Sequence, residues 1–292
     1  MNEKHPTGNG NVLAASKHHA LRQLDNYRKT YIQNWRINAN GHHSQGHYDW
    51  MAGQVAGYVR TLEIGCGVGH STLALLRDAH QVVCIEENPH CIAATQALLT
   101  EHGYSVAVIE RATAHAVDIN SYRLEYAQLN HAPAADCLII EGDALKDPQL
   151  EAWLKTQPRF DAVVCWLLGT HNSRGNNVAV DTQLMPTSFE HRIFVQNNVY
   201  ELADEILREG GILSVIDRGQ MPDSTRLKNA ILDGHRDQAS VTSLTVQRLD
   251  HTPYNETREK GAMRLQLTAP VPSAIPDGPI LLSLVAVTSR KP

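Results

Sequence analysis

The 292-residue sequence lacks several features that mark particular classes of protein. No segment approaches the roughly 18 continuous apolar residues of a membrane-spanning helix, and the first ten residues contain no apolar run like that of a secretory signal. There is no run of Lys and Arg, and the formal net charge is -5, which disfavours binding of duplex nucleic acid by counterion release. We therefore expect a cytoplasmic protein with neither a membrane nor duplex nucleic acid as its partner.

The sequence also lacks paired cysteines. Its five cysteines are isolated, no C-x-x-C motif occurs, and four of them lie in or beside apolar segments. Free thiols in such segments behave as small hydrophobic side chains, and this pattern is typical of a reducing compartment.

A metal-binding motif is also missing, although the chain contains 16 histidines. His42, His43 and His47 lie close together in the segment NANGHHSQGHYDW. Zinc sites usually need a fourth ligand and a defined spacing such as H-E-x-x-H, which the sequence does not contain. We predict no metal site and interpret this segment as a solvated loop or a loop that covers the substrate.

The chain does contain a regular alternation of short apolar runs and helical patterns, which is the signature of βαβ units. Hydrophobic residues make up 42% of it, enough for a buried core. Strands are expected at 60–64, 81–86, 137–141, 162–166, 212–217, 240–249 and 279–289. Helices are expected at 71–78, 89–102, 148–155 and 189–208, the last one ended by Gly210 and Gly211. The predicted fold is a Rossmann-like, doubly wound α/β fold with a mostly parallel seven-stranded sheet, and we expect its last two strands to be antiparallel.

Composition divides the chain into three parts. Residues 1–12 are polar and glycine-rich, and we expect a disordered tail. Residues 13–57 are predicted to form an N-terminal helical cap, because Leu21, Leu24, Tyr27, Tyr31 and Trp35 recur with a helical period. Residues 58–292 form the predicted core. Residues 103–136, before the third or fourth strand, are too long and polar for a plain crossover, so we expect an insertion there with a strand, an elaborated loop and room for a short helix.

A glycine-rich turn follows the first predicted strand, in the segment TLEIGCGVGHST. A strand that leads through glycines into a helix presents backbone N–H groups at the carboxyl edge of the sheet, where nucleotide-like ligands bind. The dinucleotide motif G-x-G-x-x-G would need a third glycine at position 70, which is His70. The pattern present is E-x-G-x-G-x-G, from Glu63 through Gly65 and Gly67 to Gly69.

This segment resembles the first motif of class I S-adenosylmethionine-dependent methyltransferases. The resemblance implies S-adenosylmethionine as the cofactor and extends from about residue 59 to 217. It implies that Glu63 serves the cationic methionine part, and that Gly65, Cys66, Gly67 and Gly69 let the backbone approach the ligand.

Later strand ends extend the resemblance. Glu86, three residues before Pro89, matches the acidic residue that holds the ribose hydroxyls. The adjacent Glu87 is expected at the cofactor site as well. Asp143 matches the acceptor of the adenine amino group, with Ala144 lining the ring. Trp166 fits equally well beside the cofactor or in the core.

The methyl acceptor is less defined. Tyr48 and Trp50 fit a substrate-covering lid or the core, and Asn172 lies beside His171, which is the best-placed candidate for a general base if it is not simply a loop histidine. The fourth strand carries neither an NPPY-like segment nor the aspartate of the magnesium-dependent catechol type.

The resulting interpretation is methyl transfer to an oxygen or nitrogen of a small molecule. The alternatives are a protein side-chain methyltransferase, a catalytically inactive protein that binds S-adenosylmethionine as a sensor, and an NAD-dependent oxidoreductase, which the missing third glycine disfavours. The sequence does not indicate the oligomeric state.

Overall fold

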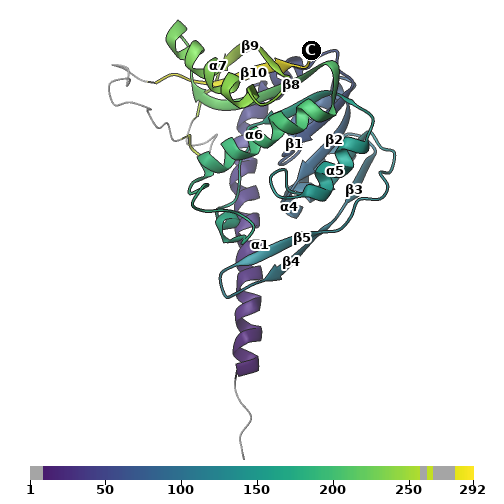
Figure 1. The fold of residues 1–292 in the computed structure, drawn as a ribbon, viewed down its shortest axis with the longest axis vertical. Helices are drawn as coiled ribbons and strands as arrows, with labels where there is room; N and C mark the ends of the chain where they lie inside the picture. Colours follow the sequence, from purple (N-terminus) through teal and green to yellow (C-terminus); the bar gives the residue numbers. More distant parts are fainter. Residues whose placement is uncertain (1–8, 257–261, 266–279) are drawn as a thin grey trace, which may run out of the picture.

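An eight-stranded sheet lies at the centre of the computed structural model, which describes residues 9–256, 262–265 and 280–292 (Figure 1). In spatial order the strands are β3 (Val106–Ile109), β6 (Cys137–Glu141), β2 (Gln81–Glu86), β1 (Arg60–Ile64), β7 (Phe160–Trp166), β8 (Leu207–Gln220), β10 (Leu282–Arg290) and β9 (Thr245–Pro253). Strands β3, β6, β2, β1, β7 and β8 pair in parallel, whereas β10 is antiparallel to both of its neighbours, β8 and β9. The predicted mostly parallel α/β sheet is confirmed, with one strand more than expected.

Helices cover both faces of this sheet (Figure 1). They are α3 (His70–Arg77), α4 (Pro89–Glu101), α5 (Pro148–Thr156), α6 (Ser188–Ile206) and α7 (Thr225–Ala239). Their starts follow from local sequence: the Asn88 side chain accepts from the His90 amide ahead of α4, and Thr187 and Glu190 form a capping box on α6.

The alternation of side chains along the strands creates two buried clusters, one on each face. Cys84 and Val164 point into the cluster formed with α1 to α4, and Leu62 and Ile64 into the one formed with α5, α6 and α7. Since both faces are covered, the central strands β1, β2, β6 and β7 are almost continuously apolar, as the sequence showed.

The end of α6 differs from the prediction. The helix stops at Ile206, and Gly210 and Gly211 lie inside β8 instead of ending a helix. A Cβ on Gly211 would lie 2.9 Å from the Arg208 carbonyl oxygen and 3.0 Å from that of Asp161, at an irregularity in the β7–β8 pairing. These glycines therefore allow a close backbone approach within a strand.

The N-terminal region forms one long helix, α1 (Asn9–Ser44), and a short one, α2 (His47–Gly53). Residues 1–8 of the predicted tail lie outside the described residues, while 9–12 are the first turn of α1. The loop expected over residues 38–50 is wrong, because α1 continues through most of it and buries Ala39 and His42 against the core. Tertiary packing outweighs the low helix propensity of Asn and Gly here. None of the helices in the described ranges is both long and apolar enough to cross a membrane.

Three strands and no helix occupy the insertion at residues 103–136, all of which the structure describes. The first, β3, adds the eighth strand at the sheet edge, beside β6. The other two, β4 (Ala112–Ala116) and β5 (Tyr122–Tyr126), form a separate hairpin that lies along α1 (Figure 1). Tyr122 and Leu124 are buried against Leu24 of that helix.

Candidate active site

A cavity lies at the carboxyl edge of the sheet, where the strand order reverses. From β1 the chain moves outward through β2 to the edge strand β3, returns to β6 between β3 and β2, and then crosses to β7 on the other side of β1. In doubly wound sheets, ligands bind at such a switch point. The cavity, together with the solvent-open space at its mouth, has an empty volume of about 700 Å³.

Glycines of the loop after β1 form one wall of the cavity. Gly65 and Gly67 line it with φ values of 80° and 56°, and Gly69, with φ 89°, precedes α3. A Cβ on Gly67 would lie only 2.6 Å from Nε1 of Trp35. The loop therefore needs glycine at position 67 both for its left-handed conformation and for the approach of α1.

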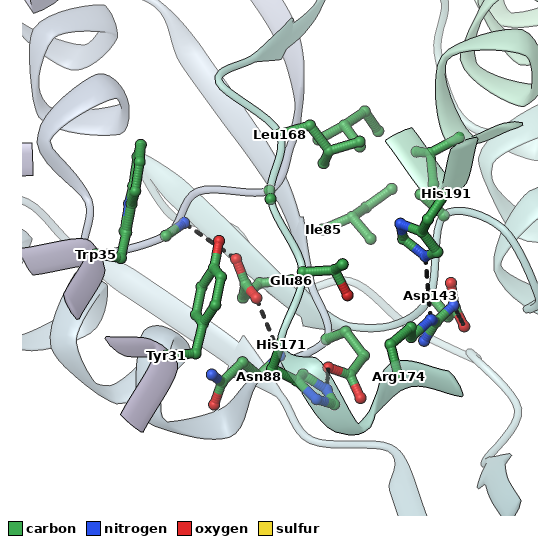
Figure 2. Close-up of a pocket in the computed structure, with 18 of the residues that line it drawn as sticks. Tyr31, Trp35, Ile85, Glu86, Asn88, Asp143, Leu168, His171, Arg174 and His191 are labelled. Carbon is green, nitrogen blue, oxygen red and sulfur yellow. Dashed lines mark hydrogen bonds and ion pairs between the residues drawn. The ribbon is translucent and has the colours of Figure 1, made fainter. Parts of the chain in front are cut away.

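Two adjacent residues at the end of β2, Glu86 and Glu87, line the same cavity. Figure 2 shows the Glu86 carboxylate there. The Glu86 carboxylate accepts hydrogen bonds from the backbone N–H groups of Gly67 and Asn88, both at 3.0 Å. Burial raises the pKa of Glu86 to about 7 in spite of these bonds. Burial would also raise the pKa of Glu87, but the hydrogen bond from His171 and the charge of Arg28 outweigh it and lower that pKa to about 2. The two neighbouring residues therefore differ: Glu86 carries a readily protonated carboxyl group, and Glu87 carries a carboxylate that stays charged at neutral pH.

Asp143 and Ala144 line the cavity after β6, beside two residues that the sequence analysis did not single out, Arg174 and His191. The Asp143 carboxylate accepts from the Leu145 amide at 2.9 Å and pairs with the Arg174 guanidinium. Arg174 Nε donates to His191 Nε2 at 3.1 Å. Both residues lie far along the chain in segments without a recognisable motif, so no sequence signal marked them.

Helix α1 contributes an aromatic wall, whose residues the sequence analysis used only as evidence for a helical cap. Tyr31 and Trp35, one helical turn apart, both line the cavity (Figure 2). A Cβ on Gly169, in the loop after β7, would lie 2.5 Å from the Tyr31 hydroxyl oxygen. Each of two cavity glycines, Gly67 and Gly169, therefore accommodates one aromatic side chain of α1. The helical spacing of these aromatics was the available signal, but it could not distinguish core from cavity.

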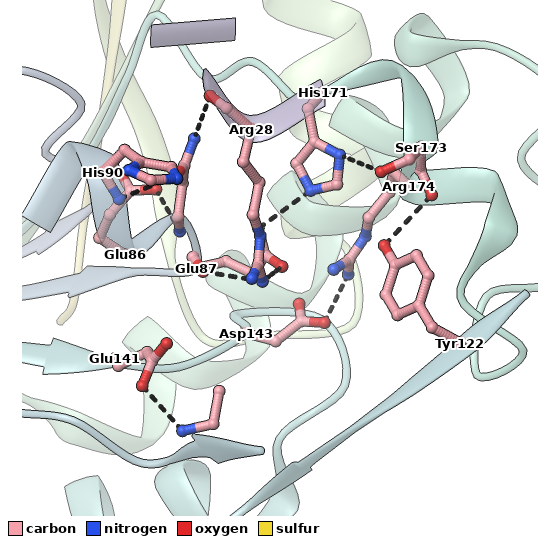
Figure 3. A network of polar contacts seen from close by, with 12 residues as sticks. Arg28, Glu86, Glu87, His90, Tyr122, Glu141, Asp143, His171, Ser173 and Arg174 are labelled. Atoms are coloured by element: carbon pink, nitrogen blue, oxygen red, sulfur yellow. Dashed lines mark hydrogen bonds and ion pairs between the residues drawn. The ribbon is translucent and has the colours of Figure 1, made fainter. Parts of the chain in front are cut away.

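His171, the predicted general base, lines the cavity but is held at both ring nitrogens (Figure 3). Its Nε2 lies 3.1 Å from a Glu87 oxygen and its Nδ1 lies 2.9 Å from the Ser173 hydroxyl. Glu87 also receives Arg28 of α1, so a buried chain of polar contacts joins three separate elements. This arrangement favours a positioning role for His171, since neither ring nitrogen is free to accept a substrate proton.

Glu63, the first carboxylate of the motif, does not line the cavity. Its side chain is 1% exposed and accepts hydrogen bonds from the hydroxyl of Thr72 at 2.6 Å, from that of Ser71, and from the Cys84 thiol at 3.2 Å. Burial raises its pKa. This position does not support the expected contact with a cationic ligand: Glu63 anchors α3 to β1, because its side chain points to the face of the sheet that α3 covers.

The other predicted residues lie around the cavity or away from it. Cys66, Tyr48 and Trp166 line a smaller hollow of about 270 Å³, which borders the cavity through Trp35, Gly65 and Leu167. The indole of Trp166 donates to the Ser214 hydroxyl at 3.0 Å, which fits its core alternative.

Trp50 and Asn172 line neither of these spaces. Trp50 packs against the core, and Asn172 is exposed at the start of the short helix η1 (Asn172–Asn176). Direct contact of these two residues with a substrate in the cavity is therefore not supported by their positions.

The histidines of residues 38–50, the segment predicted to be a loop, contact other histidines. His42 Nδ1 lies 3.2 Å from His47 Nδ1, and the rings of His43 and His70 stack at 4.8 Å. Within the described ranges, no three His, Cys, Asp or Glu side chains converge in a way that could hold a metal ion.

No protein-family model matches the sequence, and no curated protein matches it. Solved structures do match. The chain is similar to the N-methyltransferase NodS from Bradyrhizobium japonicum in complex with S-adenosyl-L-homocysteine, with 10% identity over 84% of this chain and 85% of NodS and a TM-score of 0.43.

Two further solved structures cover the same share of the chain. The BH2331 protein of Bacillus halodurans matches with 13% identity over 84% of this chain and 98% of its own, at a TM-score of 0.46. The cyclase SpnF matches with 16% identity over 84% and 80%, at a TM-score of 0.43. Identities this low concern the fold alone, and a cyclase and a methyltransferase both appear among these proteins.

Proposed function

We propose that this protein is an S-adenosylmethionine-dependent methyltransferase that transfers a methyl group to an oxygen or nitrogen of a small molecule. The observation that carries the proposal is the position of Glu86, whose carboxylate ends β2 inside the switch-point cavity and is bonded to the glycine loop at Gly67. There Glu86 would hold the ribose hydroxyls, and Asp143 would accept from the adenine amino group. Gly65 and Gly67 would lie beside the methionine part of the cofactor.

The charges of the cavity support a cationic ligand more than a pyrophosphate. Three carboxyl groups line it, Glu86, Glu87 and Asp143. Glu87 pairs with Arg28 and Asp143 pairs with Arg174, so neither arginine is free for a phosphate, and Glu86 becomes charged above its pKa of about 7. His70, in place of the third glycine, stacks 5.5 Å from Tyr48, and burial lowers its pKa to about 4, so it carries no charge at neutral pH. An ammonium and a sulfonium suit such a site better than a dinucleotide.

The sheet supports the same choice. The dinucleotide-binding order 3-2-1-4-5-6 is built from parallel strands, but here the antiparallel β10 is inserted between β8 and β9.

S-adenosylmethionine supplies an activated methyl group, so the protein has to align the acceptor and exclude water. Tyr31 and Trp35 cover the cavity from α1 and would exclude water. Glu87 and Arg28 hold His171 in place, so this residue would position the loop after β7. A cavity covered by a helix favours a small acceptor over a protein side chain.

Calorimetric titration with S-adenosylhomocysteine and NAD, followed by transfer of a radiolabelled methyl group to a metabolite extract, tests this proposal. We expect saturable binding of S-adenosylhomocysteine, no binding of NAD, and label in a small-molecule fraction. Binding without transfer to any fraction would indicate a sensor, label in protein would indicate a protein methyltransferase, and NAD binding would contradict the cofactor.

A further inference from the structure

Three side chains form one edge of the cavity: Asp143 after β6, Arg174 in η1 and His191 in α6 (Figure 2). Neighbouring nitrogens of the same guanidinium bind the other two, since Nη2 contacts an Asp143 oxygen and Nε contacts His191 Nε2 at 3.1 Å. All three are buried, with 5–8% of each residue exposed. Arg174 therefore holds Asp143 and His191 side by side.

This arrangement determines where the proton of His191 lies. A guanidinium can only donate, so His191 Nε2 has to accept and carries no hydrogen. Burial and the nearby Arg174 charge lower the pKa of His191 to about 4, so the ring is neutral at neutral pH. The single ring proton is then on Nδ1, on the side of the ring that turns from Arg174 toward the cavity (Figure 2).

The edge thus presents an acceptor and a donor next to each other. Asp143 offers carboxylate oxygens that can accept a further hydrogen bond, and His191 offers one N–H. Ile85 and Leu168 provide apolar surfaces in the same part of the cavity (Figure 2). Such a site suits a flat heteroaromatic ring with an amino group beside an unprotonated ring nitrogen.

We infer that His191 and Asp143 together read the 6-amino edge of a purine, with His191 Nδ1–H donating to a ring nitrogen beside the amino group and Arg174 positioning both. The inference rests on the proposed function, because it assumes that Asp143 faces the adenine of the cofactor. It adds a specificity-determining residue, His191, and a positioning residue, Arg174, that no sequence motif marks.

The alternative role for Arg174 is to bind an anionic ligand in the cavity. Here the Arg174 charge is matched by Asp143, and Glu87 lies close enough to influence its pKa as well. A phosphate or carboxylate ligand would meet these carboxylates, so the edge does not favour anions.

Calorimetric titration with four ligands tests the inference: S-adenosylhomocysteine, its 1-deaza and 7-deaza analogues, and the 6-oxo analogue with hypoxanthine in place of adenine. In the deaza compounds one ring nitrogen beside the amino group becomes C–H. We expect the unaltered protein to bind one deaza analogue about tenfold more weakly than the parent, the scale of one hydrogen bond. The 6-oxo analogue should bind at least tenfold more weakly, because it presents an oxygen to Asp143.

Two variants assign the effect to His191. His191→Phe keeps a ring but removes the donor, so it should bind the parent about tenfold more weakly and lose nothing further with the sensitive deaza analogue. His191→Asn places an amide N–H close to the position of Nδ1 and should recover part of the affinity for the parent. Thermal unfolding of each variant identifies any that does not fold.

The outcomes separate this inference from the proposed function. Equal affinity of the unaltered protein for the parent and both deaza analogues overturns the role of His191, whichever variants fold. The role of His191 is also overturned if His191→Phe binds the sensitive deaza analogue more weakly than the parent by the same factor as the unaltered protein does, because the two losses of affinity are then independent. Absence of any S-adenosylhomocysteine binding overturns both the inference and the proposed function.

Discussion

Glu63 and Glu86 stand near the carboxyl ends of two adjacent parallel strands, yet their surroundings differ. Glu63 is level with Cys84 in the pairing of β1 and β2, so it lies two positions deeper in the sheet than Glu86. It is enclosed by the hydroxyls of α3, whereas Glu86 reaches the cavity and is bonded to the glycine loop. The register and the alternation along the strands point both side chains to the same face of the sheet, so strand depth decides that Glu63 anchors a helix while Glu86 meets the ligand cavity.

Removal of the Glu63 carboxylate tests whether this residue stabilises the fold by anchoring α3. We expect Glu63→Ala to lower the free energy of unfolding by about 3 kcal/mol, because the buried Ser71 and Thr72 hydroxyls lose their acceptor. Urea denaturation measures this loss. Glu63→Gln keeps one acceptor oxygen and should lose less, with S-adenosylhomocysteine affinity within about threefold of the unaltered protein. A stable Glu63 variant with strongly reduced affinity would instead return Glu63 to the ligand site.

Glu86→Ala tests the ligand side of the comparison. We expect it to weaken S-adenosylhomocysteine binding by about 1.5–3 kcal/mol, the scale of losing charge-assisted hydrogen bonds to the ribose. Isothermal titration calorimetry gives the dissociation constant, and a thermal unfolding curve provides the control for folding. Unchanged affinity would remove Glu86 from the site and leave the two carboxylates functionally alike.

Gly169→Ala extends the comparison to the α1 wall of the cavity. The added methyl group would meet the Tyr31 hydroxyl at 2.5 Å, so we expect a loss of about 1–2 kcal/mol in the free energy of unfolding from overpacking. Gly175→Ala is the matched control, because its Cβ would meet Thr182 at an ordinary 3.5 Å. Equal stabilities of the two variants in urea denaturation would show that α1 is not fixed against this loop.

The pH dependence of stability gives the smallest expected effect. The Glu86 pKa is about 7 in the folded protein against an ordinary 4.5, so the folded state holds this proton more tightly than the unfolded one. The resulting stabilisation is complete below about pH 4.5 and is lost as the pH rises through 7. Relative to Glu86→Gln, the unaltered protein should lose about 1 kcal/mol between pH 6 and pH 7. A pH-independent difference in urea denaturation would contradict the raised pKa.

The sequence predicted the sheet well because covered parallel strands are short apolar runs separated by helical patterns. All seven expected strands are present, and α4 begins where Asn88 and Pro89 predict. The failures share a cause. Residues 38–50 and the pair Gly210–Gly211 carry loop and stop signals, but packing against the core and a close backbone approach in the sheet decided their conformation.

The candidate site also contains features that the sequence predicts and features that it does not. The glycine loop and the positions of Glu86 and Asp143 at strand ends follow from the sequence, because the carboxyl ends of parallel strands meet at one edge of a sheet. Tyr31, Arg174 and His191 could not be found, since they belong to elements remote in sequence that meet only after folding.

By itself, the sequence determined a parallel α/β sheet with a glycine loop at its switch point, because periodicity and turn residues act locally along the chain. Only the tertiary structure decided which side chains face the cavity. It buried Glu63 under α3, occupied both nitrogens of His171 and brought α1 over the loop. The physical reason is that alternation along a strand fixes only the face to which a side chain points, whereas the helix, cavity or hydrogen-bond partner that it meets there belongs to elements remote in the sequence.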